Sequence, residues 1–216
     1  ISMFWDPMYF VFGLPALLLA LFAQWRVRSA YRKYLQVPNT TRVSGLQAAQ
    51  YLLRSAGLNV KLETIPGDLT DHYDPRSATL RLSSGVAGSA SVGAVAVVAH
   101  EIGHAMQDAQ AFALLKLRSG LVPVVNFTSW LGPILFFVGM LLGSQELAVV
   151  GVFCFAGAVV FSLLTLPVEL DASRRAMQLL KQSNILVSES ALKGARQVLS
   201  AAALTYVAAL AQAIAT

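Results

Sequence analysis

Charged residues, cysteine and histidine are all scarce in this chain of 216 residues. Only 12% of its residues are charged and 56% are hydrophobic, whereas an ordinary soluble domain has about 25% charged residues. This composition predicts a membrane protein. The single cysteine, Cys154, excludes an intrachain disulfide, and we interpret it as a small hydrophobic residue. The net charge of +5 follows from the topology described below and requires no nucleic-acid partner.

Three stretches without any charge are long enough for transmembrane helices, because about 20 residues cross a bilayer. They are Pro7–Trp25, Ser119–Gln145 and Leu147–Val168. The last two are separated by Glu146 in a tight turn and therefore predict a transmembrane hairpin. No basic run precedes the first stretch and no small-residue cleavage site follows it, so we expect a retained anchor rather than a signal peptide. Aromatic residues near its ends fit interfacial anchors: Trp5, Tyr9 and Trp25.

A fourth charge-free stretch, Gln197–Thr216, is a weaker candidate because alanine and polar residues make up much of it. We expect a helix that packs against the catalytic part or lies at the membrane interface. A fourth transmembrane helix is the alternative.

The basic residues predict the orientation. All 16 Lys and Arg lie within residues 26–118 or 174–196, and none lies before the first span or in the hairpin turn. By the positive-inside rule, the flanking segments face the cytoplasm. We therefore expect an anchor at 1–25, a cytoplasmic catalytic part at 26–118, the hairpin at 119–168 and a second cytoplasmic part at 169–216.

The most informative motif is His100-Glu101-Ile102-Gly103-His104. Side chains four residues apart lie on one face of a helix, so both imidazoles can reach a single Zn²⁺. Glu101 would lie beside the metal, where it could take a proton from a bound water. Two of the three histidines in the chain are in this motif. The alternative without a metal site is a helix in which the two histidines occur by chance.

The sequence around this motif predicts a small mixed domain. Ser44 and Gln47 form a capping box that opens a helix through about Leu58. Residues 60–65 and 79–82 alternate apolar and polar side chains and predict two strands. The polar segment 69–75 between them is predicted to be partly extended, and 84–88 to be a loop. From about Ser89, an apolar helix through about Gln110 carries the motif and should be buried.

A catalytic zinc site needs a third protein ligand and leaves its fourth position to water. Glu169 is the strongest candidate, because it stands at the cytoplasmic end of the third span. A hairpin that leaves and re-enters the same face of the membrane would return Glu169 to the histidines. The alternatives are His72 and the other carboxylates, of which Asp171 is the first. Asp171 could also have a purely structural role, in an ion pair with Arg174 or Arg175.

Several longer motifs resemble the bacterial membrane-bound neutral zinc metallopeptidases of the YugP type, over essentially the whole chain. The motifs are Met3-Phe4 with Asp6-Pro7, Tyr34-Leu-Gln-Val-Pro-Asn39, Leu69-Thr-Asp-His-Tyr-Asp-Pro75, the His100–His104 motif, Leu166-Pro-Val-Glu-Leu-Asp-Ala-Ser-Arg-Arg-Ala176 and Ala201-Ala-Ala-Leu-Thr-Tyr-Val-Ala208. More distantly, the layout is similar to HtpX and the CAAX-prenyl endopeptidases, which are gluzincins.

This resemblance implies that Glu169 is the third zinc ligand. Ser173 replaces an aspartate of the more distant relatives, and Asp171 or Asp108 could instead orient a ligand histidine. The implied fold is a mainly α membrane protein (α+β), with three or four transmembrane helices and a small zincin-like cytoplasmic catalytic domain that contains a short β-sheet. The implied location is the bacterial inner membrane.

The expected activity is that of a zinc metalloendopeptidase. One Zn²⁺ held by His100, His104 and Glu169 would activate water and polarise the scissile carbonyl, with Glu101 as general base. A donor to the oxyanion is also expected. The candidates for that donor are His72, which ranks first, Tyr73 and Tyr206. The strand at 79–82 could pair with an extended substrate.

The expected substrates are unfolded or membrane-proximal polypeptides at the lipid bilayer, and the similarity to HtpX suggests quality control of membrane proteins. Two other classes are weaker. A non-catalytic zinc scaffold would have no need of Glu101, and structural zinc usually has four protein ligands. A transporter should carry ionisable residues inside its spans, which here have none apart from Glu169 at a boundary.

Overall fold

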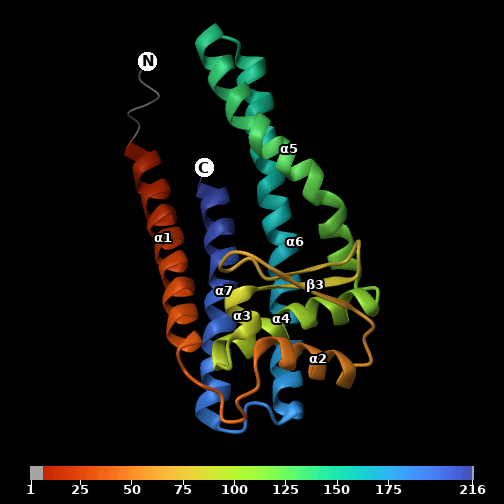
Figure 1. The fold of residues 1–216 in the computed structure, drawn as a ribbon. Coiled ribbons are helices and arrows are strands. Elements are labelled where there is room, and N and C mark those ends of the chain that lie inside the picture. The colour runs from red at the N-terminus through yellow and green to blue at the C-terminus, as the bar shows by residue number, and fades with distance from the viewer. Residues whose placement is uncertain (1–6, 216) are drawn as a thin grey trace.

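Four long helices lie side by side in this computed structural model, which describes residues 7–215 apart from the side chains at 7–13, 16, 155–156, 158 and 212–215. Their order across the layer is α1 (Pro7–Leu35), α7 (Glu189–Ala215), α6 (Gln145–Ser183) and α5 (Ala113–Leu142), and each packs against its neighbour (Figure 1). The expected anchor residue Trp5 lies outside the described residues, as do Met3, Phe4, Asp6 and the side chain of Tyr9.

Helices α5 and α6 form the predicted hairpin. Gly143 ends α5 in the left-handed conformation, at a φ of 67°, and the Ser144 hydroxyl caps α6 by accepting from the Leu147 amide. Within residues 7–215, these are the two helices long and apolar enough to cross a membrane. They expose large apolar side chains such as Leu141 and Phe153, which would be unfavourable in water. The span expected at 7–25 stays a prediction, and so does the alternative of a fourth span at 197–216.

The remaining elements pack around one buried helix, α4 (Val92–Ala109). The Ser91 hydroxyl caps this helix by accepting from the Ala94 amide. Its small apolar side chains are buried against α2 (Gly45–Ser55), α6 and α7. The Ser44–Gln47 capping box is present at the start of α2, as predicted.

A three-stranded sheet lies in front of the helix layer (Figure 1). Its strands are β1 (Lys61–Ile65), β2 (His72–Asp74) and β3 (Thr79–Ser83), with β3 between the other two. β3 pairs in parallel with β1 and antiparallel with β2. The prediction that residues 79–82 pair with substrate is therefore wrong, because both edges of β3 are already used.

Residues 84–88 differ from the sequence prediction as well. They form a short helix, α3 (Ser84–Gly88), rather than a loop. Ser83 is the last residue of β3, and its hydroxyl accepts from the Val86 amide, which caps α3 directly after the strand. Two glycines in five residues hid this helix, because glycine disfavours helices in the absence of such contacts.

Gly103 of the histidine motif allows α4 and α6 to touch. A β-carbon at this position would lie 2.5 Å from the carbonyl oxygen of Ala172 in α6. Glycine is therefore required for this close approach of the two backbones. Since His104 follows Gly103 and Glu169 lies almost one turn before Ala172, the same contact brings the histidines and the glutamate together.

Candidate metal centre

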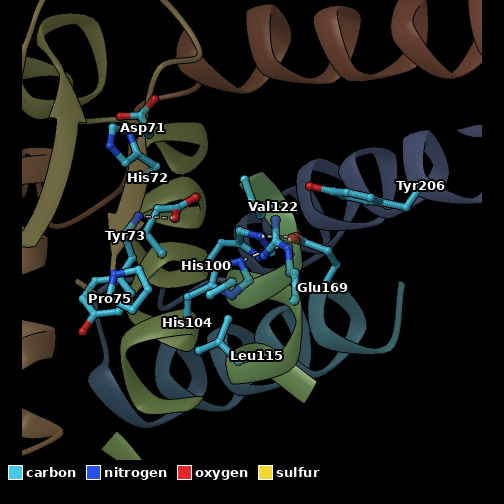
Figure 2. A pocket seen from close by; sticks show the side chains of 13 residues that line it. Asp71, His72, Tyr73, Pro75, His100, His104, Leu115, Val122, Glu169 and Tyr206 are labelled. Carbon is cyan, nitrogen blue, oxygen red and sulfur yellow. Dashed lines mark hydrogen bonds and ion pairs between the residues drawn. The ribbon is translucent and has the colours of Figure 1, made fainter. Parts of the chain in front are cut away.

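His100, His104 and Glu169 converge at the contact between α4 and α6 (Figure 2). One ligand atom from each lies within 4.8 Å of the others. The Nε2 atoms of His100 and His104 are 3.1 and 3.6 Å from Oε2 of Glu169. The two histidines occupy one face of α4 and the glutamate faces them from α6. A chance occurrence of two histidines in one helix does not account for this convergence.

A buried glutamine sets the tautomer of His104. Gln107 donates through Nε2 to the Val168 carbonyl and to Asp171, so its Oε1 is an acceptor. This Oε1 lies 3.0 Å from Nδ1 of His104. Nδ1 of His104 must therefore carry the proton, which leaves the lone pair of Nε2 facing Glu169 and free to bind a metal.

Ser173 orients the other histidine. Its hydroxyl lies 3.2 Å from Nδ1 of His100 and can accept the ring proton, which again leaves Nε2 for the metal. The expectation that Asp171 or Asp108 orients a ligand histidine directly is wrong, because Gln107 and Ser173 contact the Nδ1 atoms instead. Asp171 acts one step further out, through Gln107, and Asp108 accepts from the Tyr73 hydroxyl instead.

Arg118 holds the second oxygen of the glutamate. Its Nη1 lies 3.2 Å from Oε1 of Glu169, whose side chain is only 4% exposed. This contact turns Oε2 of Glu169 toward the two imidazoles. Sequence reasoning gave Arg118 no role in the site. Arg118 directly precedes the predicted span at Ser119, so its charge was interpreted only as part of the topology signal.

Glu101 is placed beside the three ligands and held by the sheet. Its Oε2 accepts from the Tyr73 amide of β2, at 2.9 Å. Burial raises the pKa of Glu101, partly offset by the neighbouring imidazoles. A carboxylate with a raised pKa is a better proton acceptor than an exposed one, which suits a general base.

A cavity of about 300 Å³ surrounds these groups. His72 and Tyr206 both line it, on opposite sides of the ligand cluster (Figure 2). The backbone carbonyl of Thr70 lies 2.8 Å from Nδ1 of the exposed His72. The third predicted oxyanion donor, Tyr73, is engaged elsewhere, because its hydroxyl donates to Asp108.

The donor set fits a catalytic zinc ion. Two imidazole nitrogens and one carboxylate oxygen are a common ligand set for hydrolytic zinc, and the fourth position stays open to the cavity. Gln107 accepts from Nδ1 of His104, and the Ser173 hydroxyl can do the same for Nδ1 of His100, which in each ring leaves Nε2 for coordination.

Comparison with known proteins agrees with this chemistry. Residues 9–216 match the family model described as "Putative neutral zinc metallopeptidase". The chain belongs to this family. It is also 44% identical over 209 residues to "Putative membrane protease YugP" of Bacillus subtilis (strain 168), covering 94% of this chain and 90% of that protein. No solved structure matches the chain.

We predict that Gln107→Leu weakens zinc binding while the protein stays folded. The substitution leaves Nδ1 of His104 without its acceptor, and loss of such an outer partner typically costs about 10–100-fold in metal affinity. Titration against a competing chelator measures this change. Gln110→Leu is the matched control, because Gln110 is exposed at the end of the same helix and contacts Arg175 rather than a ligand. Equal zinc affinity in the two variants would contradict the assigned role.

Proposed function

We propose that this chain is a membrane-embedded zinc metalloendopeptidase that hydrolyses unfolded or membrane-proximal polypeptides. The observation that carries the proposal is the convergence of His100, His104 and Glu169, with Glu101 lining the same cavity. Membership of the metallopeptidase family supports the reaction class. A role in the quality control of membrane proteins is part of the proposal.

In this proposal each residue has a defined task. His100, His104 and Glu169 hold one zinc ion, which when bound would activate a water molecule and polarise the scissile carbonyl. Glu101 accepts the proton of the attacking water and passes it to the leaving amine. Arg118 keeps Glu169 oriented toward the histidines.

A second donor for the developing oxyanion would come from His72 or Tyr206, of which we rank His72 first. Both line the cavity. Nδ1 of His72 donates to the Thr70 carbonyl, so His72 could donate to an oxyanion through Nε2 only as an imidazolium, with both ring nitrogens protonated. Tyr206 belongs to α7 and lies on the opposite side of the ligand cluster from His72.

The free edge of β2 supports binding of an extended polypeptide. In an antiparallel pair, alternate residues point their amide and carbonyl groups to opposite edges. The Tyr73 amide reaches Glu101, so Tyr73 faces away from β3 and toward the cavity. The Tyr73 amide is already bonded to Glu101, so an extended substrate would add to this edge through the Tyr73 carbonyl, or would replace Glu101 at the amide. Main-chain hydrogen bonds of this kind select unfolded segments rather than a particular sequence.

The position of the site supports an action near the membrane. Glu169 belongs to the same helix, α6, whose other end is at the tip of the apolar hairpin. We propose that the site faces the cytoplasm from the bacterial inner membrane, since the basic residues cluster around it.

Removal and return of the metal test this function. The purified full-length protein in detergent is expected to cleave an unstructured reporter polypeptide, to lose this activity with a zinc chelator and to regain it when zinc is restored. A non-catalytic zinc scaffold predicts bound zinc and no cleavage under all three conditions. Cleavage that persists after complete removal of the metal would contradict the proposal.

A further inference from the structure

A second cavity adjoins the ligand cluster on the side away from α5. Its volume is about 210 Å³, and it shares five polar residues with the first cavity: Asp71, His100, Glu101, Glu169 and Tyr206. The rest of its wall comes mainly from α7, with one residue each from α1, α4 and the segment before β2. The side chains that line it without lining the first cavity are Val27, Leu69, Val97, Val198, Leu199, Ala202 and Thr205. We name this cavity the α1–α7 pocket.

The α1–α7 pocket has the chemistry of a subsite for an apolar side chain. All but one of the residues that line it alone are apolar, and the exception, Thr205, is uncharged. The carboxylate of Asp71 also reaches its rim, but both oxygens accept from Ser83. A volume of 210 Å³ equals that of about seven liquid water molecules. This is enough room for one large aliphatic or aromatic side chain.

The chain direction of the segment 69–75 indicates which substrate residue reaches this pocket, the one before or the one after the scissile bond. Leu69 lines the α1–α7 pocket, whereas His72, Tyr73 and Pro75 line the first cavity. The segment 69–75 therefore runs from the α1–α7 pocket, past the ligand cluster, to the first cavity. A substrate strand added antiparallel to β2, the commoner pairing, runs the opposite way. Its residue after the scissile bond then meets the α1–α7 pocket.

We propose that the α1–α7 pocket receives the side chain of the residue immediately after the scissile bond, and that it selects aliphatic and aromatic residues there. This inference rests on the proposed peptidase function and adds a preference to it. Ala202 limits the size of the accepted side chain, because it lies on the same face of α7 as Val198 and Thr205, one turn from each.

The wild-type preference is the first test. The full-length protein in detergent digests a denatured, unstructured reporter, and mass spectrometry locates the cuts. We expect Leu, Ile, Val, Met and Phe to be enriched directly after the cut. In matched quenched fluorescent peptides, Leu at that position should give a kcat/KM about 10-fold or more above that of Ala. This is the size of discrimination that additional methylene groups give in a hydrophobic pocket. No enrichment, or enrichment of these residues before the cut instead, overturns the inference.

Filling the pocket is the second test. Ala202→Phe should reverse the Leu-to-Ala ratio of kcat/KM at unchanged zinc content, and the smaller Ala202→Val should reduce this ratio. Val207→Phe is the control, because Val207 is 41% exposed on the same helix and outside the pocket. An unchanged preference in zinc-loaded Ala202 variants would refute the pocket assignment.

The outcomes separate this inference from the proposed function. If the wild-type protein cleaves nothing, the peptidase proposal fails and the subsite fails with it. If it cleaves without the expected preference, the peptidase proposal stands and the subsite alone fails. Should both Ala202 variants lose zinc, the wild-type cleavage profile decides.

Discussion

Glu101→Gln is expected to lower kcat/KM on an unstructured reporter by about 10²–10⁴-fold, the usual contribution of a positioned general base. The amide oxygen of Gln can still accept from the Tyr73 amide, so the local structure should persist. None of the three proposed ligands is changed, and the zinc content should equal that of the wild type. Initial rates at matched zinc content, measured in the same detergent, check the prediction.

Glu63→Gln is the matched control for this experiment. Glu63 lies on β1, is half exposed and pairs only with Arg81 among the described residues, so its replacement should leave the rate nearly unchanged. Retention of near wild-type activity by zinc-loaded Glu101→Gln would remove Glu101 from the mechanism. Loss of zinc in that variant would show that Glu101 instead helps to form the metal site.

Glu169→Gln should abolish activity by a different route, through the loss of zinc. The neutral amide removes the only carboxylate among the proposed ligands and also the partner of Arg118. We expect the zinc affinity to fall by more than the roughly 100-fold that a missing outer partner costs. Zinc per protein after dialysis, measured by elemental analysis, gives the result directly.

A control on the same helix makes this test specific. Glu146→Gln changes the same chemical group in α6, but at the hairpin tip far along the helix from Glu169. It should keep both zinc and activity. If Glu169→Gln retained stoichiometric zinc at wild-type affinity, His72 or another carboxylate would have to be the third ligand.

The pairing of His100 with His104 and much of the local structure could be predicted from the sequence because they depend on short spacings. Two histidines four residues apart share a helix face in any protein, and the Ser44–Gln47 box caps a helix through its own local hydrogen bonds. The place of Glu169 followed from the predicted hairpin, because the second helix of a hairpin ends near the start of the first.

The outer part of the site could not be predicted, because it depends on contacts between distant segments. Gln107 holds His104 only because α6 presents the Val168 carbonyl and Asp171 to its amide nitrogen. Arg118 meets Glu169 across two helices. The free strand edge was placed on the wrong strand, because the pairing order of three short strands is set by tertiary packing.

X-ray absorption at the zinc edge on the purified protein is the most direct test of the central claim. The account predicts about one zinc per chain, coordinated by two histidine imidazoles and by oxygen atoms, at distances of about 2.0–2.2 Å and with no sulfur. The imidazole signal should fall when either His100 or His104 is replaced. Absence of zinc, or a bound zinc whose spectrum does not change in these variants, would contradict the account.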